Sequence, residues 1–328
     1  MQSEVEVKSN PQTESPGERV ARRVMLAIIA ISLTSGIAFR TIALDRVPPG
    51  LHADEAVEGY DAYCLLKTGR DHHGNFLPVV AMQSFNDYRK PLFVYSLVPV
   101  VATLGLTPRA VRMGAALWGA IDLIAMTAIG GLSMGLPGAA AAAMLGAVMP
   151  WHLSLSRFGI ETTCASAMVD LAMLCFLGWR RKKGAWLLAS AVFFGSSLYA
   201  YSVTGLFVPM MSAFLGVMYW KELRGQPRQT LAAAAIVIAF AVPQACAFVA
   251  KPATAGRFEQ LSLFSDSSTC LGCSSDGAQI SLSSGQHLIN FAANWASHFT
   301  PSFLFTTGDR GDHWTLCHLP GFGQLLPI

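Results

Sequence analysis

Carboxylates and histidines are crowded just after the first apolar stretch of the chain, between Val47 and Gly74. This segment holds five carboxylates and three histidines: Asp54, Glu55, Glu58, Asp61, Asp71, His52, His72 and His73. We expect raised pKa values for the adjacent Asp54 and Glu55, because they repel each other and are partly desolvated at a membrane surface. Such a carboxylate suits a general base, which contributes about 10²–10⁴ to a rate. The same residues also suit the first turn of an amphipathic helix, where acidic side chains complement the helix dipole.

Two further clusters carry charge next to apolar segments. Arg89 and Lys90, in "SFNDYRKPLF", can either meet a lipid phosphate or simply extend to the membrane interface. Arg157 and Glu161, in "PWHLSLSRFGIETT", lie four residues apart between two apolar spans. An ionisable pair at a membrane mouth indicates a functional site, although a plain ion pair between the two side chains is the alternative.

The end of the chain mixes aromatic residues with Asp309, Arg310, Asp312 and His313. This composition suits an outer loop that covers a lipid or sugar site, and an ordinary aromatic belt would be similar. No metal site is predicted, because the adjacent histidines project differently and no third ligand is fixed by spacing. The CLGC motif of Cys270 and Cys273 lacks the second half of a zinc site, so a disulfide or free thiols are expected there.

The composition indicates a polytopic membrane protein. Hydrophobic residues make up 52% of the 328 residues and charged residues only 13%, whereas soluble domains carry about 25% charged residues. The net charge of +3 gives no indication of a nucleic-acid partner. Residues 1–20 are polar and contain Pro, so they are expected to form a disordered cytoplasmic tail.

The first span is predicted from about Val24 to Leu44, with Arg22 and Arg23 before it placing the N-terminus in the cytoplasm. Arg40 lies near the far end, where its side chain is expected to extend to the interface. A long outer loop then runs from about residue 46 to 108. Further spans are predicted to start near Val111, Gly138, Thr162, Ala185, Gly205 and Thr230.

The number of crossings depends on the segment from Pro91 to Leu106. It is only about 16 residues long, short of the roughly 20 that a spanning helix needs, and it contains two prolines. We therefore interpret it as an interfacial or re-entrant segment. Both basic loops, 179–184 and 221–228, then face the cytoplasm, and a second outer loop covers about 152–162. The fold class expected is an all-α membrane domain over residues 21–250 with about seven spans, followed by an outer segment over 251–328.

In order and spacing, these pieces resemble the GT-C membrane glycosyltransferases that use polyprenyl-phosphate sugars. The chain is most similar to the bacterial dolichyl-phosphate-mannose protein mannosyltransferase family and its lipid A aminoarabinose transferase relatives. The resemblance covers about residue 40 to the end. It is carried by "PPGLHADEAVEGYDA", "GRDHHGNFLPV", "YRKPLFVY", "PWHLSLSRFGIET" and "HFTPSFLFTTGDRGDHWTLCHLPGFGQL". The family fold implies interfacial helices in the first outer loop.

The resemblance also implies roles for individual residues. Asp54 matches the catalytic base, with Glu55 as its companion and His52 in support, and Glu161 matches the acid of the second outer loop. Lys90 falls where the family contacts the lipid-linked phosphate. Further contacts to the donor headgroup are implied for Arg89, Arg157, Asp309, Arg310 and His313.

The function implied is an inverting transfer of a sugar from a polyprenyl-phosphate donor to a hydroxyl acceptor on a protein, lipid or envelope glycan. The site would lie at the outer face of a bacterial inner membrane. No cofactor is predicted to be required, although some GT-C relatives hold a divalent cation with loop acids. Family members continue with further spans after "GFGQL", so the chain is expected to be truncated.

Two alternatives remain open. A transporter would need charged or polar residues inside the spans, or helices broken by Gly or Pro at the midplane, whereas here the ionisable groups are expected at the outer mouth. An inactive, truncated remnant would keep only the lipid-binding groove.

Overall fold

The computed structural model describes residues 15–85, 87–250 and 284–303. Within these residues the chain is almost entirely helical, with one small antiparallel hairpin. The helices are α1 (Pro16–Thr41), α2 (Ala53–Thr68), α3 (Leu92–Leu104), α4 (Pro108–Val148), α5 (Pro150–Ser156), α6 (Thr162–Lys182), α7 (Trp186–Ser197), α8 (Thr204–Met218), α9 (Trp220–Arg224), α10 (Pro227–Ala250) and α12 (Ser284–Ser297). The hairpin pairs β1 (Met82–Ser84) with β2 (Asp87–Arg89).

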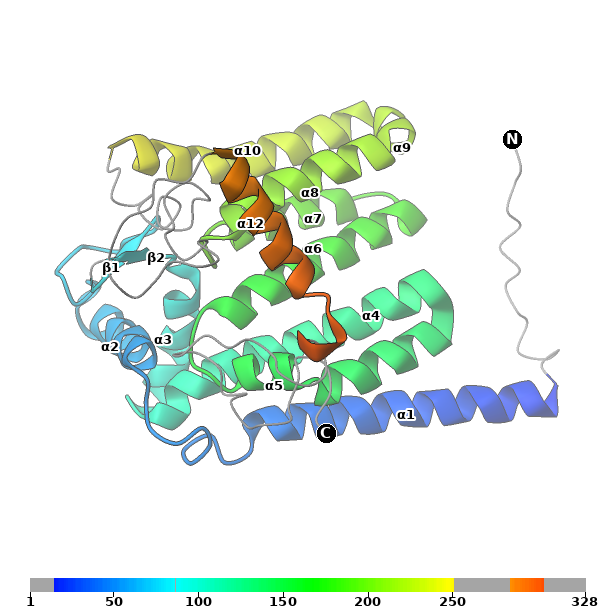
Figure 1. Cartoon of the computed structure of the whole chain (residues 1–328), viewed down its shortest axis with the longest axis horizontal. Helices are drawn as coiled ribbons and strands as arrows, with labels where there is room; N and C mark the ends of the chain where they lie inside the picture. Colours follow the sequence, from blue (N-terminus) through cyan, green and yellow to red (C-terminus); the bar gives the residue numbers. More distant parts are fainter. Residues whose placement is uncertain (1–14, 86, 251–283, 304–328) are drawn as a thin grey trace.

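The longer helices lie side by side as a bundle (Figure 1). Helix α4 packs against α1 and α6, and α7 packs against α6 and α10. Helices α2 and α3 and the hairpin gather at one end, which we call the acidic end after the carboxylates of residues 54–61. The start of α1, the α6–α7 turn and α9 lie at the opposite end, which we call the basic end after residues 179–184 and 221–228.

Helix α4 is two helices joined by a sharp turn. Gly135 has φ 70° and ψ −161°, a conformation that residues with a Cβ rarely adopt, and Pro137 follows it. The chain therefore runs from the acidic end to the basic end and back again within α4 (Figure 1). These two arms are the spans predicted to start near Val111 and Gly138.

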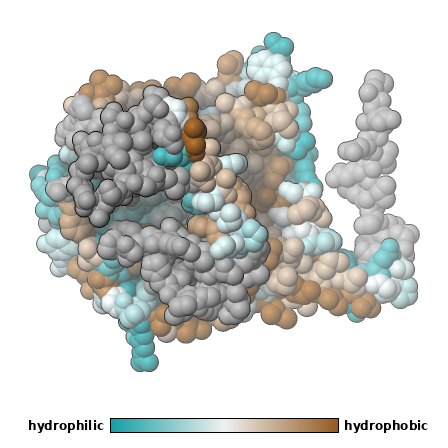
Figure 2. Space-filling model, in the orientation of Figure 1, coloured by the Kyte–Doolittle hydropathy of each residue, from teal (hydrophilic) through white to brown (hydrophobic). Residues whose placement is uncertain are grey.

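Four of the described helices are long and apolar enough to cross a membrane: α1, α4, α6 and α10. Helices α3, α7 and α8 are apolar but shorter. Figure 2 shows hydrophobic surface along the sides of the bundle and hydrophilic surface mainly at its two ends. The expected all-α, polytopic fold is confirmed, and each predicted span has a helical counterpart. Helix α3, at 13 residues, and α7, at 12, are each about 20 Å long or less, and neither helix is long enough by itself to cross a bilayer.

The predicted N-terminal tail extends too far along the chain. Helix α1 begins at Pro16, where the Ser15 hydroxyl accepts a hydrogen bond from the Glu18 N–H and the Glu18 carboxylate accepts one from the Ser15 N–H. This reciprocal pair is a capping box, which stabilises a helix start. Residues 16–20 therefore belong to α1 and not to a disordered tail.

The prediction that Arg40 extends to the interface is wrong. Its side chain is fully buried, and its guanidinium donates to the Gly36 and Gly146 carbonyls, at 2.8 and 2.7 Å. It also contacts His152 Nδ1 at 2.6 Å, while His152 Nε2 lies 2.9 Å from Asp122 Oδ2. Ionisable residues therefore lie inside the bundle as well as at its mouth, contrary to the expectation that was used against a transporter.

Candidate active site

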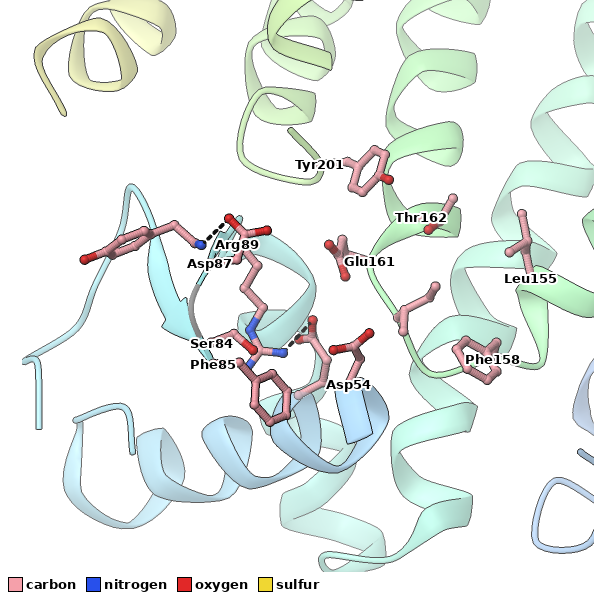
Figure 3. A pocket seen from close by; sticks show the side chains of 13 residues that line it. Asp54, Ser84, Phe85, Asp87, Arg89, Leu155, Phe158, Glu161, Thr162 and Tyr201 are labelled. Carbon is pink, nitrogen blue, oxygen red and sulfur yellow. Dashed lines mark hydrogen bonds and ion pairs between the residues drawn. The ribbon is translucent and has the colours of Figure 1, made fainter. Parts of the chain in front are cut away.

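A cavity of about 390 Å³ opens at the acidic end of the bundle. Figure 3 shows Asp54, Arg89 and Glu161 pointing into one space from three separate elements: α2, the hairpin and the α5–α6 loop. The cavity is lined by Asp54, Glu58, Ser84, Phe85, Asp87, Tyr88, Arg89, Leu155, Phe158, Ile160, Glu161, Thr162 and Tyr201.

Helix α2 sets the direction of the carboxylates. Its N-cap is His52, whose Nδ1 accepts from the Asp54 N–H at 3.1 Å, and the Glu55 carboxylate accepts from the His52 N–H at 3.0 Å. The predicted helix with an acidic first turn is confirmed, but it is not amphipathic, because its buried face carries Glu55, Glu58 and Asp61. Asp54 and Glu58 are one turn apart and therefore share a face, and both line the cavity. The Asp54 side chain keeps 38% of its surface exposed, whereas Glu58 is buried.

The Glu55 side chain points away from this cavity and is held by buried hydrogen bonds. Arg112, at the start of α4, donates from Nε to Glu55 Oε1 at 2.8 Å and from Nη2 to Oε2 at 3.1 Å. The Gly159 N–H donates to the same carboxylate at 2.9 Å. Burial alone would raise the pKa of Glu55, but Arg112 and the two backbone N–H groups outweigh it and hold the pKa below its ordinary value. The raised pKa expected for this residue is therefore wrong.

The rest of the Arg112 guanidinium fixes the linker between α1 and α2. Nη1 donates to the Leu44 and Pro48 carbonyls at 3.0 and 2.8 Å, and Nη2 donates to the Gly50 carbonyl. One side chain thus ties together the end of α1, the start of α2 and the start of α4. Arg112 could not be selected from the sequence, because its partners are far away in the chain.

Glu58 faces a second buried arginine. Arg89 Nη1 lies 3.0 Å from Glu58 Oε1, and Arg89 Nη2 donates to Asp61 Oδ2 at 2.8 Å. Asp61 also accepts from the backbone N–H of His72 at 2.9 Å and contacts its ring nitrogen at 2.6 Å. Glu58 and Asp61 were not selected from the sequence. Their spacing from Asp54, by four and seven residues, places all three on one helix face and was the available signal.

Burial raises the pKa of Glu58 well above its usual range, and Glu161, which lies in contact with it, adds to the rise against the opposing effect of Arg89. The single charge of Arg89 is shared with Asp61, so it does not fully compensate the three carboxyl groups around it. Burial alone would lower the pKa of Arg89, but Glu58, Asp61 and Glu161 outweigh it and raise the pKa. The cluster therefore favours an ionised Arg89 beside a protonated Glu58.

This second pair is not saturated with hydrogen bonds. Among the described residues, Arg89 Nε and Nη1 donate no hydrogen bond, and neither oxygen of Glu58 accepts one. Arg89 Nη1 and Glu58 form an ion pair, but the angles between the two groups are unsuitable for a hydrogen bond. Because buried polar groups normally have partners, these atoms have capacity for a ligand in the cavity that they line.

Lys90, the next residue, is directed elsewhere. Its Nζ lies 2.5 Å from Gln244 Oε1 and 5.2 Å from the centre of the Phe248 ring, and burial lowers its pKa to about 8. A separate apolar cavity of about 540 Å³ begins beside it, because Pro91 and Pro243, the chain neighbours of Lys90 and Gln244, both line it. Its other lining residues come from α3, α7, α10 and the segment before the hairpin: Val79, Val80, Leu92, Tyr95, Ser196, Tyr199, Ala239 and Phe240.

Arg157 and Glu161, the two residues predicted for the second outer loop, lie in different surroundings. Glu161 lines the polar cavity and contacts Glu58. Arg157 instead donates to the carbonyls of Phe39, Ala43 and Val47, where it secures the end of α1. It makes no ion pair with Glu161, so the simple pairing left open from the sequence is not formed.

The remaining predicted residues lie outside the described part of the chain: Asp309, Arg310 and His313, together with Cys270 and Cys273. In the described segments, no group of three or more His, Cys, Asp or Glu side chains is arranged to hold a metal ion. The described residues that line the cavity all fall within the first 201 positions.

Residues 89–246 match the dolichyl-phosphate-mannose-protein mannosyltransferase family. ArnT from Cupriavidus metallidurans, solved bound to undecaprenyl phosphate, aligns with a TM-score of 0.50 and 15% identity over 73% of this chain and 44% of that one. Its apo form aligns with a TM-score of 0.53 and 14% identity over 85% of this chain and 50% of that one. No curated protein sequence matches.

The sequence identities to the two solved structures are low, so the likeness shows a shared fold and nothing more. The chain spans half or less of the length of the two solved chains. The matched family segment begins at Arg89 and ends at Cys246, and it therefore includes Lys90, Gln244 and the second outer loop.

Proposed function

We propose that the chain is a GT-C membrane glycosyltransferase that transfers a sugar from a polyprenyl-phosphate donor to a hydroxyl acceptor; the family match over residues 89–246 and the shared fold support this. The observation that carries the proposal is the meeting of Asp54, Glu161 and Arg89 around one polar cavity (Figure 3). An apolar cavity lies beside Lys90, the residue next to Arg89. Such a pairing of polar and apolar spaces fits a ligand with a sugar phosphate at one end and a hydrocarbon chain at the other.

Asp54 is the proposed general base. A sugar or protein hydroxyl is a weak acid and needs a carboxylate placed at its proton. Asp54 is the cavity carboxylate best suited to this role, because it is partly exposed and has no arginine partner among the described residues. Glu55, held by Arg112, is assigned the role of positioning the first turn of α2.

The proposed transfer needs no further reagent, because each bond that forms is matched by one that breaks. The acceptor oxygen attacks the anomeric carbon, its proton passes to Asp54, and the bond from that carbon to the phosphate oxygen breaks. Attack from the face opposite the leaving group inverts the anomeric configuration. The leaving group is the lipid phosphate, whose developing charge is stabilised by cationic N–H donors.

Arg89 and Lys90 are the proposed donor-binding cations. Arg89 has unused N–H groups beside the cavity, and Lys90 lies next to the apolar cavity that we assign to the polyprenyl chain. We keep Arg310, Asp309 and His313 as proposed contacts to the donor headgroup. Arg157 is assigned to holding the second outer loop against α1.

The proposed orientation places the basic end in the cytoplasm and the cavity at the outer face of a bacterial inner membrane. Residues 179–184 and 221–228 lie at the same end as the start of α1, with Arg22 and Arg23 near it (Figure 1). Positively charged loops favour the cytoplasmic side.

A transporter is a second candidate, favoured by one observation. Arg40, His152 and Asp122 form a buried, hydrogen-bonded chain inside the bundle. Ionisable residues in this position are frequent along the paths of ions and protons.

The decisive experiment follows release of polyprenyl phosphate from radiolabelled polyprenyl-phosphate sugars by the purified protein, with envelope extract as the source of acceptors. The same assay is run on the protein in two forms, in detergent and in lipid vesicles. Asp54→Asn is compared with Asp45→Asn, a control that changes an exposed carboxylate paired only with exposed Arg46. Release that needs Asp54 but not Asp45 supports the proposal. Donor binding without release supports the lipid-binding remnant, and absence of both, in both forms, favours the transporter.

A further inference from the structure

The second arm of α4 ends in a break, and an arginine from another helix fills the gap. Helix α4 ends at Val148, Met149 has φ −56° and ψ 116°, and α5 begins at Pro150. In an unbroken helix the Gly146 carbonyl would accept from the N–H of residue 150, but proline has none. Arg40 Nη2 donates to that carbonyl at 2.7 Å, and Nη1 lies 3.5 Å from the next one, that of Ala147. Because a membrane interior has no water to satisfy these groups, Arg40 takes the place of the missing backbone donor.

The Arg40 charge is linked through His152 to a carboxylate. Arginine only donates, so His152 Nδ1 must accept from it at 2.6 Å, and His152 Nε2 therefore carries the hydrogen that goes to Asp122 Oδ2 at 2.9 Å. Arg40 and Asp122 are fully buried and His152 is 4% exposed. The chain of contacts joins α1, the first arm of α4 and α5, and Asp170 of α6 lies close to Asp122.

The break determines where α5 points. Helix α5 has seven residues, and its far end leads into the loop that brings Phe158, Ile160 and Glu161 to the polar cavity. Its last residue, Ser156, lies so close to α4 that a Cβ at Gly119 would be 2.2 Å from the Ser156 hydroxyl. The direction of α5 at Pro150 and its contact with Gly119 therefore set the place of Glu161.

We propose that Arg40, His152 and Asp122 are positioning residues, which hold the break between Met149 and Pro150 and thereby place Glu161 against Glu58. The effect on turnover rests on the proposed glycosyltransferase function, whereas the effect on loop position does not. The three residues act through the loop and do not touch substrate.

The first test is Pro150→Ala, which restores an N–H that can donate to Gly146 and lets α4 continue into α5. We expect the unfolding temperature to stay the same or rise, while kcat falls about tenfold or more and the KM for the donor stays within about twofold. A network that only stabilises the bundle would leave kcat unchanged in this variant. That result would overturn the proposal.

The second test compares two replacements of His152. His152→Gln can accept from Arg40 with its carbonyl and donate to Asp122 with its amide, whereas His152→Leu can do neither. We expect the Gln variant to keep most of the wild-type kcat and the Leu variant to lose about tenfold or more. Equal kcat values in the two folded variants would contradict the proposal. Ser190→Ala is the control, because it removes a buried hydroxyl that donates to Ala172, in the other half of the bundle.

A distance measurement separates this proposal from the proposed function. Spin labels are placed in a cysteine-free background at Tyr60→Cys on α2 and Ile160→Cys in the α5–α6 loop, and their separation is measured by pulsed electron resonance. We expect the distribution to shift in Pro150→Ala and His152→Leu and to stay in place in His152→Gln and Ser190→Ala. If no variant shifts, the positioning role is wrong whatever the activity. If the distances shift as expected and even the parent protein releases no lipid phosphate, the positioning role holds and the proposed function fails.

Discussion

Helix α2 carries two buried glutamates, three residues apart, that meet two buried arginines in different ways. Glu55 and Arg112 are joined by two hydrogen bonds, and the remaining N–H groups of Arg112 reach three backbone carbonyls. Glu58 and Arg89 approach to 3.0 Å without a hydrogen bond between them. The first pair also lines a small cavity of about 220 Å³, but its hydrogen bonds are filled by protein groups. The second pair borders the larger cavity with hydrogen-bonding atoms left unused.

The difference shows how the same residue types serve as scaffold or as site. Removing two charges from water is costly, and excellent geometry with further hydrogen bonds is needed to compensate. The Glu55 pair has that geometry, and the pKa of Glu55 is lowered; the Glu58 pair lacks it, and the pKa of Glu58 is raised. We infer that the first pair holds the fold and the second is kept for a ligand.

The largest expected effect is on the cavity side of this comparison. Asp54→Asn should reduce transfer by about 10²–10⁴, the contribution of a general base, with little change in unfolding temperature because the side chain is partly exposed. Release of radiolabelled polyprenyl phosphate measures it. Full activity in a folded Asp54→Asn protein would remove Asp54 from the role of base.

The next prediction contrasts the two arginines. Arg112→Met leaves Glu55 buried without its cation and should lower the free energy of unfolding by about 3–5 kcal/mol. Arg89→Met should cost less, because Glu58 already favours its protonated form and Asp61, the other partner of Arg89, keeps its two contacts with His72. Denaturant unfolding in detergent, followed by tryptophan fluorescence, tests both. Equal losses for the two variants would break the distinction between scaffold and site.

The contributions of Glu55 and Glu58 to stability should change with pH in opposite directions. The pKa of Glu55 is lowered in the folded protein, so its contribution to stability is present at neutral pH and is lost as pH falls. The pKa of Glu58 is raised, so its contribution is present below the ordinary carboxyl pKa and is lost as pH rises. At pH 7, Glu55→Gln should therefore cost about 1.5–3 kcal/mol, and Glu58→Gln should cost nothing or stabilise. Unfolding curves at several pH values would show whether the two slopes are indeed opposite.

The smallest predicted effect concerns Lys90, which extends the comparison to a third cation. Burial lowers its pKa to about 8, so the ammonium loses its charge as pH rises through that value. Donor affinity should then fall by up to about tenfold per pH unit above pH 8. Lys90→Arg, which keeps its charge, should show a flat profile over the same range, and Lys90→Ala should bind weakly throughout. A profile that is flat in the parent protein would exclude Lys90 from donor binding.

The sequence was sufficient for the fold class and for part of the cavity. Long apolar runs with short basic loops predicted the helical bundle, because these patterns are local. Asp54, Arg89 and Glu161 were all selected, and the structure places all three on one cavity. Glu58 could have been added from its position on the same face of α2 as Asp54.

The partners of the buried arginines could not be predicted in this way. Arg112 stands at the start of an apolar helix, and its partner Glu55 lies 57 residues earlier. Arg40 was interpreted from its place along a single helix, whereas its role depends on a carbonyl 106 residues away that Pro150 leaves without a donor. Such contacts belong to the tertiary structure, and neither periodicity nor spacing reports them.

Gly159 gives the cavity one rigid wall. Its N–H binds Glu55, and a Cβ there would lie 2.6 Å from Val111 and 3.3 Å from the Glu55 carboxylate, so α2 and the second outer loop are fastened together with no room between them. The opposite wall is a hairpin of two three-residue strands, whose Phe85 is 59% exposed. Because Phe85 is exposed, amide hydrogen exchange should be faster there than at Gly159. The proposed base, Asp54, and the second acid, Glu161, thus both lie on the wall that Gly159 fastens in place, so the spacing of these two carboxylates should stay constant when a ligand binds.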